Sequence, residues 1–159
     1  MAPKLSHLDA RGRVRMVDVS RKQVTRREAV ARGRVSMKRT MLALLKGGKT
    51  PKGDVIATAH LAGVMAAKRT SELIPLAHAL PLDGVTLSFD LESHSDAVGI
   101  EARATTQART GVEMEALTAV AVAALTLYDM LKAVDRSMVI GEIALWEKRG
   151  GRSGTFRRR

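Results

Sequence analysis

Asp129 and Lys132 are the residues whose types and spacing best suit proton transfer. They stand three positions apart within residues 112–134, a stretch rich in Ala, Leu, Met and Val without Gly or Pro, which predicts a helix. At 100° per residue the two side chains share a helix face that also carries Thr118, Val122 and Leu125. A carboxylate beside an amine can supply a proton acceptor and a donor, although an ordinary exposed ion pair has the same spacing.

Glu113 and Glu115 lie at the start of the same predicted helix. Acidic side chains are favoured near the positive end of the helix dipole, which explains both without a function. The free amides of a helix start also bind anions, so a ligand site there stays open.

Two further candidates fall on predicted loops. His78 lies between Pro75 and Pro81, where a histidine can be solvated, bonded to the backbone or catalytic. Lys52 belongs to KGGKTPKGD, which mixes glycines and lysines but lacks the G-x-x-x-x-G-K-[ST] spacing of a phosphate-binding loop. Lys52 can still bind a phosphate as a point charge.

Composition narrows the chemistry. The chain has no cysteine, which excludes disulfides, thiolate catalysis, cysteine-ligated zinc and iron–sulfur clusters. No unbroken apolar run approaches the roughly 18 to 20 residues of a membrane span, and the N-terminus lacks the apolar stretch of a signal peptide. We therefore expect a cytoplasmic protein that does not use a membrane.

The formal charge of +11 is unevenly distributed. Residues 1–49 hold 14 Lys and Arg against 3 acids, residues 50–140 hold 7 against 11, and residues 141–159 hold 6 against 2. Basic ends favour an anionic partner, either nucleic acid or a small polyphosphate. Only four aromatic residues are present and none forms a stacking platform, so no nucleic-acid partner is expected.

The elements that must position these residues follow from periodicity and turn signals. Strict alternation predicts strands and the 3.6-residue period predicts helices. The first part of the chain is expected to form an extended arm at 13–20, a strand at 29–37, a short helix that Thr40 caps and that runs to Leu45, and a helix at 55–73 capped by Asp54. A hairpin of 84–93 and 97–105, the helix at 112–134 and a strand at 138–148 follow.

This order predicts an α+β fold, a ferredoxin-like βαββαβ sandwich with an antiparallel sheet and an N-terminal extension. We expect one domain over residues 1–159, in which residues 1–20 form an extended arm. The basic tail at 150–159 is predicted to be flexible.

Several of these segments, in this order, resemble the MoaC family of cyclic pyranopterin monophosphate synthases. The similarity runs from about Ser6 to Phe156. It is carried by MVDVS, KGDVIATA, AAKRTSELIPLAH, TGVEMEALTAVAVAALTLYDMLKAVD and MVIG.

The resemblance implies a homohexamer, a trimer of dimers with active sites built at subunit interfaces from both chains. The implied substrate is (8S)-3′,8-cyclo-7,8-dihydroguanosine 5′-triphosphate, which the family converts into a tricyclic pterin with a cyclic phosphate while pyrophosphate leaves. No redox cofactor is implied and no metal site is expected, apart from Mg²⁺ that can accompany a triphosphate.

Site residues follow from the same resemblance. Asp129 matches the catalytic aspartate, Lys132 the lysine that shares its acid–base work, and Lys52 another essential lysine. The residues matched to substrate binding are the loop Leu76, Ala77 and His78, the helix start Glu113, Met114 and Glu115 at the base, and Lys68, Arg27 and Lys148 at the triphosphate.

The chain departs from the family pattern at two places. Ala77 and Ala79 flank His78 where the family usually reads Cys-His-Pro, which we expect to loosen the loop. Arg152 replaces a usual lysine and can still bind phosphate. A basic nucleic-acid-binding module of the same fold and a pathway scaffold without catalysis stay as alternatives.

Overall fold

The computed structural model describes residues 7–9 and 11–159, so part of the predicted arm, residues 1–6 and 10, lies outside the described residues. The elements in chain order are β1 (Thr25–Ser36), α1 (Arg39–Lys46), α2 (Val55–Lys68), α3 (Thr70–Leu73), β2 (Gly84–Asp90), β3 (Ala97–Ala108), α4 (Glu113–Leu131), β4 (Val139–Arg149) and β5 (Phe156–Arg157).

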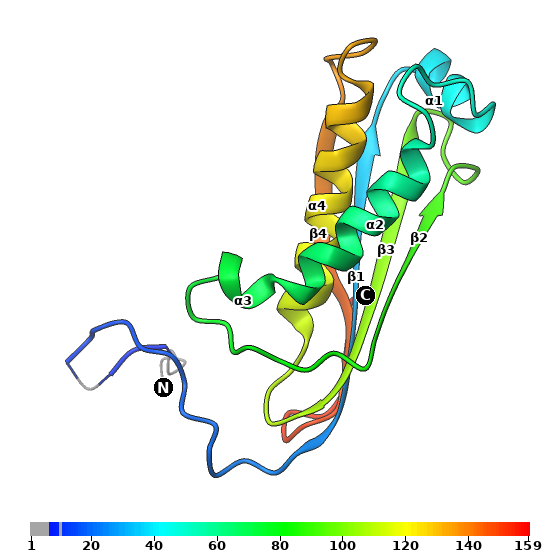
Figure 1. Ribbon diagram of the computed structural model, residues 1–159. Coiled ribbons are helices and arrows are strands. Elements are labelled where there is room, and N and C mark those ends of the chain that lie inside the picture. Colours follow the sequence, from blue (N-terminus) through cyan, green and yellow to red (C-terminus); the bar gives the residue numbers. More distant parts are fainter. Residues whose placement is uncertain (1–6, 10) are drawn as a thin grey trace.

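A single antiparallel sheet forms one layer, with its strands in the order β2-β3-β1-β4-β5. The longest pairing joins β1 to β3, from Thr25 opposite Ala108 to Ser36 opposite Ala97. Helices α2 and α4 lie side by side across one face of this sheet (Figure 1). The predicted ferredoxin-like α+β fold is confirmed, with β5 added at the edge.

Small side chains let the helices approach the sheet and each other closely. The helix-facing side of β1 and β3 is built from buried residues such as Ala29, Ala31 and Ala102. A β-carbon on Gly63 of α2 would lie 3.0 Å from the carbonyl oxygen of Ala119 in α4. Because the two helices touch there, the ends of α4 are held at fixed positions over the sheet.

The helices differ from the prediction at two points. The expected helix at 55–73 is divided at Arg69, where Thr70 turns its hydroxyl back to donate to the carbonyls of Ala66 and Ala67. This local bond competes with the regular ladder and favours the break. Thr40 does not cap α1, since the cap position is Lys38 and no side chain bonds there, whereas Asp54 caps α2 as expected by accepting from the Ala57 amide at 2.9 Å.

The basic tail folds back along the sheet edge. Phe156 and Arg157 of β5 pair with Lys148 and Glu147 of β4. The periodicity analysis missed this strand because two residues are too few to show alternation. The flexibility expected for residues 150–159 stays a prediction.

Candidate active site

The acid–base candidates meet at the C-terminal end of α4. The Nζ atom of Lys132 lies 2.6 Å from Oδ1 of Asp129, and Nζ of Lys52 donates to the Asp129 carbonyl oxygen at 3.1 Å. The turn before α2 therefore brings Lys52 to the pair although it is far away in the sequence. The Lys132 hydrogen bond and charge, with the charge of Lys52, hold the pKa of Asp129 below its usual range. This carboxylate is ionised at neutral pH, which is the form that accepts a proton, and the lowered pKa makes it a weaker base than a free aspartate.

In a single chain this end of α4 faces solvent. The side chains of Asp129 and Lys132 are 62% and 51% exposed. Water screens an exposed ion pair strongly, so the pair contributes little to stability as it stands. A substrate or another surface would have to cover it before its charges acted at full strength.

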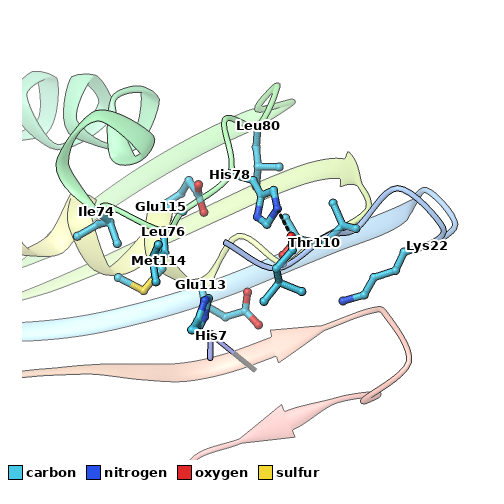
Figure 2. A pocket seen from close by; sticks show the side chains of 14 residues that line it. His7, Lys22, Ile74, Leu76, His78, Leu80, Thr110, Glu113, Met114 and Glu115 are labelled. Carbon is cyan, nitrogen blue, oxygen red and sulfur yellow. Dashed lines mark hydrogen bonds between the residues drawn. The ribbon is translucent and has the colours of Figure 1, made fainter. Parts of the chain in front are cut away.

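The other candidates meet at the opposite, N-terminal end of α4. A cavity of about 460 Å³ lies there between the loop after α3 and the first turn of α4. Figure 2 shows the loop and helix side chains around it, together with residues of the N-terminal arm. Of the predicted substrate-binding residues, it brings together Leu76, Ala77, His78, Glu113, Met114 and Glu115.

His78 is fixed by the N-terminal arm. Its Nε2 atom lies 2.7 Å from the carbonyl oxygen of Val17, the bond drawn dashed in Figure 2. A carbonyl oxygen only accepts, so Nε2 carries a proton. In the neutral ring this leaves Nδ1 as an acceptor toward a ligand. The bond also ties the His78 loop to the arm at Val17, although no proline stands beside His78.

Glu115, at the N-terminal end of α4, is unusual for an acidic residue because its carboxyl group is buried. It is only 4% exposed, and burial, helped by the negative charge of Glu113, raises the pKa of its carboxyl to about 7. At neutral pH this group can therefore hold a proton and donate it, or lose it and accept. An exposed carboxyl is enough to interact favourably with the helix dipole. The dipole therefore does not explain why the Glu115 carboxyl is buried.

Two of the predicted phosphate ligands lie beside this pocket. Arg27 and Arg152 line a second cavity of about 720 Å³, and Lys22 lines both cavities. The Arg27 guanidinium donates to the carbonyls of Ala108 and Arg109 at 3.4 and 3.3 Å. Lys148 bonds to the Ser153 hydroxyl in the turn that also carries Arg152.

Lys68 is placed apart from these cations. It lies at the C-terminal end of α2, in a shallow cavity with Leu80, which also lines the main pocket. Within the part of the chain that the structure describes, no group of three or more His, Asp or Glu side chains is arranged to hold a metal ion. Mg²⁺ bound with a triphosphate stays a prediction.

The pocket also contains residues that the sequence does not predict for the site. Val17 and Val19 of the arm line the main pocket, together with Lys22 and Thr110. From the sequence, the MVDVS segment is predicted only as part of an extended arm that resembles the family. A strand-like stretch has no local signal for folding over a distant pocket, so only the tertiary structure places it there.

The two candidate groups lie at opposite ends of one helix. Fifteen residues separate Met114 from Asp129 in α4, which at 1.5 Å per residue is about 22 Å. One chain therefore does not bring its acid–base pair to its own pocket. The fold and these residues are typical of an enzyme that handles a phosphorylated ligand.

Comparison with known proteins agrees with this class. The profile described as "MoaC family" matches residues 16–151, and the chain belongs to the MoaC family. A cyclic pyranopterin monophosphate synthase of Thermomicrobium roseum is 61% identical over 155 residues, 98% of this chain and 93% of the relative. One of Chloroflexus aurantiacus is 60% identical, covering 98% and 95%. The synthase 3 of Mycobacterium tuberculosis is 59% identical, covering 97% and 86%.

Proposed function

We propose that this chain converts (8S)-3′,8-cyclo-7,8-dihydroguanosine 5′-triphosphate into cyclic pyranopterin monophosphate and pyrophosphate at a site shared between two subunits. Identity near 60% over almost the whole length to named synthases supports the reaction. The chain acts as a cyclic pyranopterin monophosphate synthase in molybdenum cofactor biosynthesis, a lyase. We propose that it works in the cytoplasm as a homohexamer, a trimer of dimers.

One observation supports a site shared between two subunits. Asp129, Lys132 and Lys52 gather at one end of α4, and the pocket with His78 and Glu115 lies at the other. General acid–base catalysis needs its groups within hydrogen-bond reach of the proton that moves. A second subunit would bring the acid–base end of one chain to the pocket end of another.

Formation of the cyclic phosphate determines the roles that we assign to Asp129, Lys132 and Lys52. A substrate hydroxyl attacks the α-phosphorus, the bond from phosphorus to the bridging oxygen breaks, and pyrophosphate departs with that electron pair. We assign the hydroxyl proton to the ionised Asp129, while the ammonium groups of Lys132 and Lys52 stabilise developing charge. This uses the geometry seen at the pair, where one carboxylate touches one amine.

Binding is assigned to the other end. Arg27, Lys148, Lys68 and Arg152 hold the triphosphate, since guanidinium and ammonium groups are the usual phosphate ligands. The purine-derived ring is assigned to the pocket of Leu76, Ala77, His78, Glu113, Met114 and Glu115, whose donors and acceptors suit a base edge.

Purified chain with the cyclised substrate tests the function. The proposal predicts release of one pyrophosphate per pterin formed, with the pterin detected as its fluorescent oxidation product. Lys132→Ala is expected to abolish release while circular dichroism stays unchanged. A wild-type chain that binds nucleic acid in a salt-dependent way and releases no pyrophosphate would overturn the synthase in favour of the binding module.

A further inference from the structure

Asp135 is a buried acidic residue to which the proposed mechanism gives no role. It follows α4 in the turn that leads to β4, and it is 2% exposed. Glu115 is the other buried acid in the described part of the chain. A carboxyl group loses its water on burial, so it is seldom buried unless protein donors replace that water. Asp135 therefore needs donors within the fold.

Three hydrogen-bond donors and one ammonium group surround the Asp135 carboxylate. Its Oδ1 atom accepts from the amide and the hydroxyl of Ser137 at 2.9 and 2.6 Å, and its Oδ2 atom accepts from the Lys38 amide at 3.2 Å. The Lys38 Nζ atom lies 3.9 Å from Oδ1. The bonds from Ser137, followed by those of Lys38, hold the pKa of Asp135 below its usual range. Asp135 is thus a buried ion at neutral pH, and each of its oxygens has a partner.

The two partner residues belong to parts of the chain that are far apart in sequence. Ser137 shares the turn with Asp135, whereas Lys38 stands 97 residues earlier and immediately precedes α1. The chain runs from Lys38 through α1 into the turn that carries Lys52. Figure 1 shows α1 and the C-terminal end of α4 at the same end of the sheet. Asp135 therefore joins the segment of Lys52 to the end of α4.

The backbone before Asp135 continues the last turn of α4. The Asp135 amide donates to the carbonyl of Leu131 at 3.1 Å, and the Lys132 amide donates to the carbonyl of Tyr128 at 2.8 Å. The Tyr128 hydroxyl also donates to the carbonyl of Arg136 at 3.3 Å. Because Asp135 and Lys132 belong to one hydrogen-bonded turn, a shift of Asp135 would move Lys132 as well.

We propose that Asp135 is a positioning residue for the acid–base group. Its carboxylate holds the start of α1 against the turn after α4, and this contact sets the position of the Lys52 amine relative to Asp129 and Lys132. Asp135 acts through these residues and not on the substrate. The inference rests on the proposed function, because it assigns the acid–base work to the same three side chains.

The attachment of α1 does not need a charged group. Met41, Leu42 and Leu45 of α1 are buried in the core, and apolar burial supplies most of the stability of a fold. Apolar packing has no preferred direction, whereas hydrogen bonds to a carboxylate fix distance and direction. A misplacement of about 1 Å can reduce catalysis by about 10²-fold. The Asp135 carboxylate therefore adds position to an attachment that the apolar residues already supply.

Asp135→Asn tests the connection to α1. An amide has one oxygen in place of two, so it cannot accept from both Ser137 and Lys38. The pocket residues lie at the other end of α4 and stay unchanged. We therefore expect kcat for pyrophosphate release to fall about 30-fold per folded subunit, with KM within about twofold of the wild type. A variant that is only less stable would instead keep its kcat per folded subunit.

Asp90→Asn is the matched control. Asp90 also accepts from two backbone amides, those of Glu92 and Ser93 at 2.9 Å each. Both amides belong to its own turn after β2, so this carboxylate joins no distant segment to α4. We expect kcat and KM of this variant to equal the wild-type values.

Chemical labelling measures the position of Lys52 without turnover. Acetic anhydride modifies free amines, and mass spectrometry compares Lys52 with Lys49, an exposed lysine of the same turn. In the fold, the Lys52 amine donates to the Asp129 carbonyl. Asp135→Asn should raise the ratio of Lys52 to Lys49 labelling at least about threefold, the effect of losing one hydrogen bond, and Asp90→Asn should not change it.

Ser137→Ala decides the question if Asp135→Asn does not fold. It removes one donor and keeps the carboxylate, so we expect kcat to fall about threefold with KM unchanged. An unchanged kcat in Asp135→Asn, or in Ser137→Ala if the first variant does not fold, overturns the positioning role while the synthase stands. A wild-type chain that releases no pyrophosphate refutes the synthase, and an unchanged labelling ratio would then refute the positioning of Lys52 as well.

Discussion

The two ends of α4 treat a carboxyl group in opposite ways. At the C-terminal end Asp129 is exposed, bonded to an amine, and its pKa is lowered. At the N-terminal end Glu115 is buried beside another acid, and its pKa is raised to about 7. One helix thus carries an ionised acceptor at one end and a carboxyl that can hold a proton at the other.

This difference shows what each end lacks. The exposed pair has reactive groups but lines neither the main pocket nor the second cavity, and the pocket has few groups suited to displace pyrophosphate. Low dielectric strengthens electrostatic catalysis, and the pocket end holds a buried carboxyl, Glu115, whereas the acid–base pair is exposed. The contrast supports the proposed site, which would combine one end from each of two chains.

Removing the acceptor should have the largest effect. Asp129→Asn keeps the shape but removes the negative charge, so we expect kcat for pyrophosphate release to fall by about 10³-fold, within the range for loss of a general base. The matched control is Asp83→Asn, on the exposed loop before β2, which should keep the wild-type rate. A rate for Asp129→Asn within tenfold of the control would remove this residue from the mechanism.

Neutralising the other carboxyl should affect stability. Below pH 4.5 Glu115 is protonated in both folded and unfolded chains. As the pH rises to about 7 the unfolded chain loses the proton first, so stability falls, by about 3 kcal/mol in total above that pH. Glu115→Gln should therefore match the wild type at pH 4 and exceed its free energy of unfolding at pH 8.

Urea denaturation at equal subunit concentration measures this difference. The control is Glu72→Gln, at an exposed glutamate on α3. This substitution should change the free energy of unfolding at neither pH 4 nor pH 8. A Glu115→Gln variant that is less stable than the wild type at pH 8 would mean that the buried carboxylate is stabilised by a contact that the fold does not show.

A substitution in the turn behind the pocket should have the smallest effect on activity. Gly151 has a φ of +75°, and a β-carbon there would lie 1.8 Å from Nη1 of Arg27. Gly151→Ala must therefore displace the guanidinium, and we expect KM to rise about tenfold with kcat little changed, as for the loss of one uniform binding contact. Gly154→Ala is the control, because its φ of +64° is similar but nothing lies within 4 Å. Equal KM values in both variants would show that Arg27 does not contribute to substrate binding.

Most of the fold could be predicted from local patterns. Alternation in the segments of β2 and β3 predicted their hairpin, and the helix of 112–134 was found within a few residues of α4. The break at Arg69 could not be predicted, because it depends on the Thr70 hydroxyl bonding back to the carbonyls of Ala66 and Ala67. Strand β5 is not predicted because its two residues, Phe156 and Arg157, are too few to show alternation.

The site was predictable in its residues but not in its arrangement. Spacing placed Asp129 beside Lys132, and the family resemblance named Lys52, whose contact with Asp129 the fold shows. Burial of Glu115 is a property of tertiary packing, and no local pattern distinguishes it from Glu113. The separation of the two groups along α4 also appears only when both are placed on one helix.

Mixing two inactive variants tests the shared site most directly. Asp129→Asn keeps its pocket and His78→Ala keeps its acid–base pair, so a dimer of one of each contains one intact site and one with both changes. Random pairing of equal amounts makes half of the dimers mixed, and we expect the co-expressed chains to regain about a quarter of the wild-type rate. A mixture no more active than its two parents would contradict a site built from two chains.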